Sequence, residues 1–169
     1  MSNKHVTILV FILAVAIGGV NIASAQQTKQ EIKAGKEAII KQKIADKKYV
    51  FIAQSATPMR GTVRQLSEEY DLRVAPDSII SYLPYFGVAY SAPINSSEGG
   101  IRFTSVSFAY ASVNRNKGGW DITIKPRDAS EVQQLFLSIF SNGSATLQVI
   151  SANRQPISFS GYISDRDKN

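Results

Sequence analysis

The chain contains no cysteine, and its only histidine, His5, lies near the N-terminus. The absence of cysteine excludes disulfides, thiol nucleophiles and thiolate zinc sites, and it also excludes a lipid-modified cysteine as a bacterial membrane anchor. Without a histidine in the body of the chain, neither a Ser-His-Asp triad nor a histidine-based metal site can form. We therefore expect a protein that is not an enzyme and that uses no metal or cofactor.

The N-terminal segment has the features of a secretory signal peptide. A basic start at Lys4 is followed by an apolar run over Ile8–Ile17, which is shorter than the ~20 residues of a membrane-spanning helix. The segment ends in Ala23-Ser24-Ala25, an A-x-A cleavage pattern. This pattern predicts cleavage between Ala25 and Gln26, and it predicts a periplasmic or secreted mature protein that has lost its only histidine.

A lysine-rich leader follows the predicted cleavage site. The chain has a formal net charge of +6, and much of the excess lies in residues 26–48. Residues 26–47 favour a helix, but their isoleucines share a face with several lysines, so we expect this helix to pack only weakly. Residues 29–48 are a candidate contact for an anionic surface, and the alternative is a solvated helix. The rest of the chain is nearly neutral and lacks a basic–aromatic stripe, which argues against nucleic-acid binding.

From residue 48 to residue 163 the sequence has the pattern of short strands separated by turns. The alternation is clearest in Gly119–Lys125, where Trp120, Ile122 and Ile124 are expected to point inward. Asn142-Gly143 between two apolar runs predicts a hairpin. The predicted strands are Lys48–Ala56, Tyr70–Val74, Ile79–Ser91, Ile101–Val113, Gly119–Lys125, Val132–Phe140, Ala145–Ser151 and Ile157–Ile163.

Two of these strands are irregular. Pro84 or Gly87 should bend the third strand, and a change of apolar phase within the fourth strand, Ile101–Val113, predicts a β-bulge. No helical segment is long enough for parallel crossovers. We therefore expect a mainly β fold: an eight-stranded antiparallel up-and-down barrel, or a closely related sandwich, over residues 48–163, with a tail at 164–169.

The segment Tyr82–Pro93 contains the distinctive run Leu83-Pro84-Tyr85-Phe86-Gly87. Around it, in order, lie Pro58-Met59-Arg60-Gly61, Tyr70-Asp71-Leu72, Gly99–Phe103, Gly119-Trp120, Gly143–Leu147, Asn153-Arg154 and Ile157–Ile163. In this order and spacing the chain resembles domain-of-unknown-function family 4251, secreted proteins found mainly in Bacteroidetes. The resemblance implies a compact, lipocalin-like β-barrel preceded by a helix, and it implies no activity.

Aromatic residues crowd the third, fourth and fifth predicted strands. The candidate ligand-binding residues are Tyr82, Tyr85, Phe86, Tyr90, Phe108, Tyr110 and Trp120, with Phe103 in the same group. In one interpretation they line the mouth of a cavity, since an eight-stranded barrel is wide enough for one small ligand. In the other they fill the core and pair across strands.

The remaining polar motifs are short. The close acidic pairs Asp128/Glu131, Glu68/Glu69 and Asp165/Asp167 are expected to be solvated charges in turns or at the C-terminal tail. The sequence Asp77-Ser78-Ile79 resembles the O-glycosylation signal of exported Bacteroidetes proteins, so Ser78 is a candidate modification site, and the alternative is a turn residue at the start of a strand.

Two functions are compatible with these patterns. The first is a non-catalytic exported barrel that binds a small apolar or amphipathic ligand or an envelope component. The second is a structural or interaction protein of the cell envelope with a filled core. A cavity of ~300 Å³ or more would favour the first function, and a solid core would favour the second.

Overall fold

The computed structural model describes residues 20–90, 99–116 and 118–164. In these residues the helix α2 (Val20–Ala45) precedes the β region. The strands are β1 (Tyr49–Pro58), β2 (Arg64–Val74), β3 (Ile79–Leu83), β4 (Ile101–Ser105), β5 (Phe108–Asn114), β6 (Trp120–Pro126), β7 (Val132–Ile139), β8 (Ser144–Ser151) and β9 (Ile157–Ser164). The predictions for residues 1–19, 91–98 and 165–169 lie outside the described residues, and cleavage between Ala25 and Gln26, within α2, stays a prediction.

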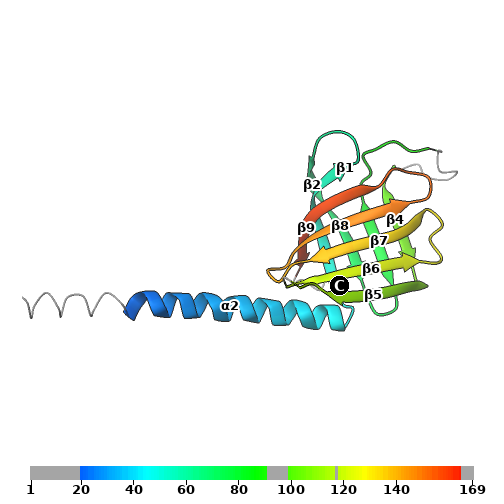
Figure 1. Cartoon of the computed structure of the whole chain (residues 1–169). Helices are drawn as coiled ribbons and strands as arrows, with labels where there is room; N and C mark the ends of the chain where they lie inside the picture. The colour runs from blue at the N-terminus through cyan, green and yellow to red at the C-terminus, as the bar shows by residue number, and fades with distance from the viewer. Residues whose placement is uncertain (1–19, 91–98, 117, 165–169) are drawn as a thin grey trace, which may run out of the picture. The chain divides into compact units, whose positions relative to one another are not determined.

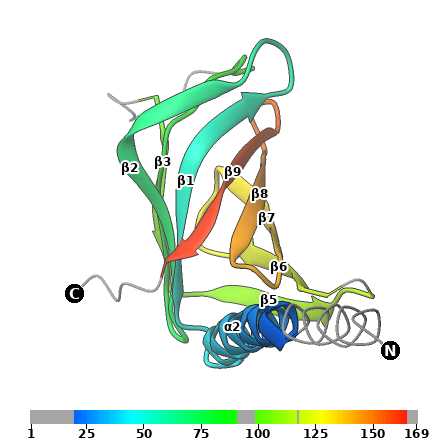
Figure 2. The same ribbon diagram turned by 90° about the vertical axis from the view of Figure 1, so that its left-hand side faces the viewer.

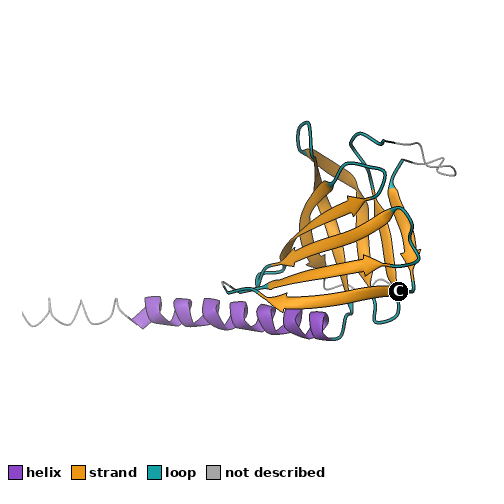
Figure 3. Ribbon diagram, turned by 45° about the vertical axis from the view of Figure 1, so that its right-hand side comes forward, coloured by secondary structure: helices purple, strands orange, loops and turns teal. Residues whose placement is uncertain are grey.

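All nine strands form one antiparallel sheet in the order β4-β3-β2-β1-β9-β8-β7-β6-β5 (Figure 1). Strands that are consecutive in the chain pair with one another, except that β4 and β5 stand at opposite edges and β9 returns to pair with β1. The sheet curls so that its two edges approach each other, which makes a nearly closed barrel (Figure 2, Figure 3). The expected antiparallel barrel after a helix is confirmed, and the described residues form nine strands rather than eight.

The ninth strand arises because the predicted strand Ile101–Val113 is two strands. β4 ends at Ser105, the chain turns at Val106 and Ser107, and β5 begins at Phe108 on the other edge of the sheet. The change of apolar phase therefore marks the end of a strand, and the predicted bulge is wrong. The register shifts of the sheet lie elsewhere, in β1 beside Gln54 and in β7 beside Gln133.

The second and third predicted strands have different lengths from those expected. β3 ends at Leu83 because Pro84, which follows, has no N–H to donate to a ladder. Beyond it Ala89 forms an isolated bridge with Arg154. β2 begins at Arg64, earlier than predicted, so Glu68 and Glu69 lie in this strand and not in a turn as expected. The first half of β2 escapes prediction because it is polar and mostly exposed and so lacks an apolar alternation.

The interior of the barrel is filled with apolar side chains. Trp120, Ile122 and Ile124 are buried as predicted. The Asn142-Gly143 hairpin between β7 and β8 is also confirmed, with Gly143 at a φ of 87°. The largest fully buried side chains come from seven strands and are Phe51, Phe159, Leu72, Ile79, Leu83, Ile122, Ile124, Leu135, Leu137, Ile139, Leu147 and Ile157.

The chain divides into two units between Lys36 and Glu37. In the first unit, the described side chains of α2 are all exposed. Among the described residues, no helix is long and apolar enough to cross a membrane. The second unit contains the last turns of α2 together with the barrel.

The C-terminal end of α2 is held by a Schellman motif. Lys47 adopts a φ of 51°, its N–H bonds to Ile44 O at 3.2 Å, and the N–H of Lys48 bonds to Lys43 O at 2.9 Å. This left-handed turn ends the helix and leads directly into β1. Lys43 also donates from Nζ to the carbonyl oxygen of Ser164 at 3.3 Å, which joins the helix to the end of β9.

Two isoleucines of this last helical segment belong to the core. Ile40 and Ile44 are 4 % and 5 % exposed, and both are part of the apolar cluster that fills the barrel. Ile40 also lies against the β7–β8 turn, because its Cδ1 would be 3.7 Å from a Cβ placed on Gly143. The segment of α2 from Glu37 onward therefore packs more closely than the expected weak contact.

We expect Ile44→Ala to lower the free energy of unfolding by about 2–5 kcal/mol, as deletion of a buried isoleucine does. Urea unfolding followed by far-UV circular dichroism measures the effect. Ile39 is the matched control: it is on the same helix but 52 % exposed, so Ile39→Ala should change stability by less than about 0.5 kcal/mol. Equal losses in the two variants would contradict the packing of α2 described here.

Candidate functional site

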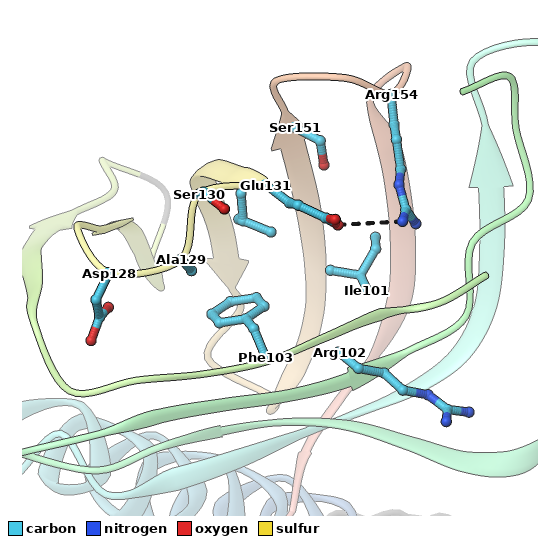
Figure 4. A pocket seen from close by; sticks show the side chains of 10 residues that line it. Ile101, Arg102, Phe103, Asp128, Ala129, Ser130, Glu131, Ser151 and Arg154 are labelled. Carbon is cyan, nitrogen blue, oxygen red and sulfur yellow. Dashed lines mark hydrogen bonds and ion pairs between the residues drawn. The ribbon is translucent and has the colours of Figure 1, made fainter. Parts of the chain in front are cut away.

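A pocket of about 180 Å³ lies where the barrel does not close (Figure 4). One wall is the edge strand β4, and the facing wall is the loop between β6 and β7. Ser151 at the end of β8 and Arg154 in the β8–β9 turn complete it. The lining residues are Ile101, Arg102, Phe103, Asp128, Ala129, Ser130, Glu131, Val132, Ser151 and Arg154.

Arg154 holds one end of this pocket together. Its side chain is only 6 % exposed, and Nη1 donates to the carbonyl oxygens of Gly100 at 3.0 Å and Gly99 at 3.4 Å, just before β4. Nη2 lies 3.3 Å from Oε2 of Glu131 in the β6–β7 loop. One guanidinium therefore links three segments, and its fork of donors suits this arrangement better than a single ammonium would.

The distinctive Leu83–Gly87 segment is packed against the same arginine. The guanidinium of Arg154 lies 5.2 Å from the ring centroid of Tyr85. The Tyr85 hydroxyl lies 2.9 Å from the carbonyl oxygen of Val88 and 3.1 Å from that of Gln155. A Cβ on Gly87 would come within 2.7 Å of this hydroxyl. Glycine at position 87 thus leaves room for the tyrosine that fastens the β3–β4 connection to the β8–β9 turn.

Asp128 holds the other end of the pocket. Its carboxylate accepts hydrogen bonds from Ser105 Oγ, from the N–H of Val106 at 2.9 Å and from the N–H of Ser107 at 3.1 Å. These donors, with that of Ser105 the strongest, lower the pKa of Asp128 below its ordinary value. The carboxylate therefore provides the hydrogen-bond acceptors for the donors at the turn in which the chain passes from β4 to β5.

A pair of tyrosines joins the start of β1 to β5. The hydroxyl oxygens of Tyr49 and Tyr110 are 3.2 Å apart, and the ammonium of Lys47 lies 5.1 Å from the centroid of the Tyr110 ring. Burial raises the pKa of Tyr49 well above its ordinary value, and burial also raises the pKa of Tyr110. Both hydroxyls are therefore protonated near neutral pH and serve as neutral hydrogen-bonding groups.

None of the seven candidate ligand-binding residues lines the pocket. Trp120 is buried in the core, and Phe108 and Tyr110 pack against the core from the edge strand β5. Tyr85 is fastened to Val88 and Gln155 as described above, and Phe86 carries the guanidinium of Arg64 at 4.9 Å from its ring centroid.

The other two candidates lie at the surface. Tyr82 stacks on Tyr70 with ring centroids 5.5 Å apart and carries Arg102 on a ring face at 4.4 Å. Tyr90 is largely exposed. The structure thus distributes the seven candidates between the core, the surface and the β3–β4 connection. Of the wider aromatic group, Phe103 on β4 does line the pocket.

Sequence reasoning missed the three charged residues that organise the pocket. Asp128 and Glu131 lie in a loop as expected, but they hold the β4–β5 turn and Arg154 and are not simply solvated. Arg154 was visible only as part of the Asn153-Arg154 segment of the family resemblance. The pair Gly99-Gly100, whose carbonyl oxygens accept from Arg154, was the available signal in the sequence. Adjacent glycines indicate a close approach of the backbone to another segment. In the structure a Cβ on Gly100 would come within 2.7 Å of the carbonyl oxygen of Leu83.

The described residues contain no group of three or more His, Cys, Asp or Glu side chains placed to hold a metal ion. Ser78 lies in the turn between β2 and β3, partly exposed, with its Oγ donating to a carboxylate oxygen of Asp77 at 3.0 Å. Modification of Ser78 stays a prediction.

Comparison with known proteins agrees with this architecture. Residues 31–163 match the family described as "Domain of unknown function (DUF4251)". The chain belongs to the DUF4251 family. The match begins at Glu31, so it includes the part of α2 that packs on the barrel as well as the β region.

A solved structure has the same fold. It is the crystal structure of a DUF4251 family protein from Bacteroides eggerthii, and it aligns with a TM-score of 0.57 and 14 % sequence identity over 79 % of this chain and 90 % of that chain. At this identity the likeness concerns the fold alone. Comparison with curated proteins finds no match.

We expect Arg154→Lys to lower the free energy of unfolding by about 1–3 kcal/mol, because a single ammonium cannot serve the Gly99 and Gly100 carbonyls and Glu131 together, and buried acceptors lose their donor. Chemical unfolding at neutral pH measures this loss. In the control Glu131→Gln, the side chain is 50 % exposed, so the loss should stay below about 1 kcal/mol. A fully stable lysine variant would contradict the role given to the guanidinium fork.

We expect Asp128→Asn to destabilise the protein at neutral pH. Since the folded-state pKa of Asp128 is lowered, the stabilisation by the carboxylate is present above its unfolded pKa of about 3.9 and is lost as the pH falls through the folded pKa. The unfolding free energies of wild type and variant should therefore converge on acidification. The exposed turn carboxylate of Asp77 supplies the control, Asp77→Asn, which should have the smaller effect at neutral pH. A difference in unfolding free energy between wild type and Asp128→Asn that stays constant through this acid range would exclude the charge of the carboxylate as the cause of the stabilisation.

Proposed function

We propose that this DUF4251 protein is a non-catalytic, exported barrel that acts by binding a macromolecular partner at its surface, as an interaction protein of the cell envelope. The observation that carries the proposal is the filled interior. Twelve large side chains inside the barrel are completely buried, and the pocket at the seam measures about 180 Å³. Pockets that enclose drug-sized ligands usually measure ~300–1,000 Å³.

The filled interior favours the second of the two functions considered from the sequence over an enclosed small apolar ligand. The candidate ligand-binding aromatics support the same choice, because most of them already have partners within the protein. Trp120 is part of the core, and the Tyr85 hydroxyl is hydrogen-bonded to two carbonyl oxygens. The ring of Tyr82 stacks on Tyr70 and contacts the guanidinium of Arg102.

The proposal of export rests on the Ala23-Ser24-Ala25 cleavage pattern after the apolar run. The proposal of a non-catalytic role rests on the lack of cysteine and of any histidine beyond His5. The proposal of release into the periplasm or medium in soluble form is supported by the lack of a lipoprotein cysteine. Contact of the α2 lysines with anionic surfaces would be a secondary, salt-sensitive attraction. The described helix lacks a clean apolar face, so it does not favour deep insertion into lipid.

Native mass spectrometry of the protein purified from its own periplasm or culture medium tests this proposal. We expect a chain that begins at Gln26 and carries no stoichiometric small molecule. A mass that retains residues 1–25 would contradict export with cleavage. A small molecule that stays bound at one copy per chain, and that is lost on unfolding, would contradict a filled barrel. It would favour instead a barrel that binds a small ligand.

A further inference from the structure

Among the strands of the described residues, the edge strand β4 has a neighbour on one side only. It pairs with β3 along its whole length, from Ile101 opposite Leu83 to Ser105 opposite Ile79, and it ends the sheet. Alternate residues of such a strand direct their N–H and C=O groups away from the sheet. β4 and β5 could have closed the barrel by pairing with each other, but they remain the two opposite edges.

The pocket lies directly beside this edge. Ile101 and Phe103, two residues apart on β4, line it from one side, and Ala129 of the β6–β7 loop lines it from the other (Figure 4). Val132, the first residue of β7, also lines the pocket. Side chains of neighbouring strands that face the same side of a sheet lie next to one another. An additional strand placed against β4 would therefore point alternate side chains into this apolar part of the pocket.

The charged groups around the pocket are already engaged by the protein. Glu131 is paired with Arg154, Asp128 accepts three hydrogen bonds from the β4–β5 turn, and Arg102 lies on Tyr82 and donates to its hydroxyl at 3.2 Å. Burying a charge beside such satisfied groups would be costly. The charge pattern is thus complementary to an uncharged segment.

We infer that the seam beside β4 binds an extended, uncharged peptide segment of a partner protein, which pairs with β4 as an additional strand and places one leucine-sized side chain between Phe103 and Ala129. This inference rests on the proposed interaction function and names its surface. Strand addition supplies main-chain hydrogen bonds for affinity and a side-chain pocket for specificity. Because β4 has five residues, the bound segment is about five residues long, or roughly 16 Å at ~3.3 Å per residue.

The probe is the capped peptide acetyl-Thr-Thr-Leu-Thr-Thr-amide, titrated into the ¹⁵N-labelled full-length protein while amide resonances are recorded. We expect saturable shifts concentrated in Ile101–Ser105 and in Ala129–Val132. Replacing the central leucine of the peptide by aspartate should weaken binding at least about tenfold, a change of ~1.4 kcal/mol. No saturable shift with the leucine peptide, or shifts centred elsewhere, would overturn the inference.

Two further arms separate strand pairing from occupation of the pocket alone. A peptide with N-methyl groups on alternate amides keeps the side chains but cannot pair on that edge, so its binding should be lost. Equal binding would mean that the pocket takes a small apolar group without strand addition, which contradicts the inference. This arm uses the wild-type protein and so does not depend on any variant folding.

A variant that fills the pocket gives the complementary result. Ala129→Leu should weaken the leucine peptide at least about tenfold, while Ala111→Leu, at an exposed position of β5, should bind it like wild type. Unchanged affinity in Ala129→Leu, with a native spectrum, would overturn the inference. If these titrations show no binding and the native mass spectra show no bound small molecule, only this surface is rejected. If the native mass spectra show a resident small molecule, the proposed function itself is rejected.

Discussion

The whole fold depends on how a nine-stranded sheet is held closed without pairing its two edges. β4 and β5 are separated by only Val106 and Ser107, yet within the described part of the chain each bonds to a single strand neighbour. A continuous ladder would have removed both edges. Here side chains hold the seam: Asp128 at the β4–β5 turn and Arg154 at the opposite end of β4. Between these two fastenings lies the pocket.

This arrangement explains why the most distinctive part of the sequence is not in the barrel wall. Pro84 ends β3, and the following residues cross to the β8–β9 turn, where Tyr85 bonds to the carbonyl oxygen of Gln155 and lies beside Arg154. Gly87 leaves space for the tyrosine ring and hydroxyl. The Leu83–Gly87 segment is thus a structural fastening of the seam, and an enclosed ligand is not needed to explain its composition.

The strands with a regular apolar alternation were predicted accurately. Trp120, Ile122 and Ile124 point inward, and the Asn142-Gly143 turn lies between β7 and β8, because both features depend on local backbone geometry. The errors arose where local pattern and long-range pairing differ. The polar first half of β2 is held by the register with β1. The local pattern of Ile101–Val113 predicts one strand, because nothing local distinguishes a bulge from a turn that leads to another sheet edge.

The candidate site shows the same division. Its aromatic residues were found by composition, but composition could not say which of them face the core, and the charged residues of the seam looked like ordinary loop charges. By itself the sequence determined the class of the fold, the inward faces of its clearest strands, the helix before the barrel and the absence of disulfides. Only the tertiary structure decided which strands are edges, that Ile40 and Ile44 enter the core, and that Arg154, Glu131 and Asp128 meet at one seam. The physical reason is that alternation and turn chemistry act between residues close in the chain, whereas the contacts of the seam join residues about 20 to 70 positions apart.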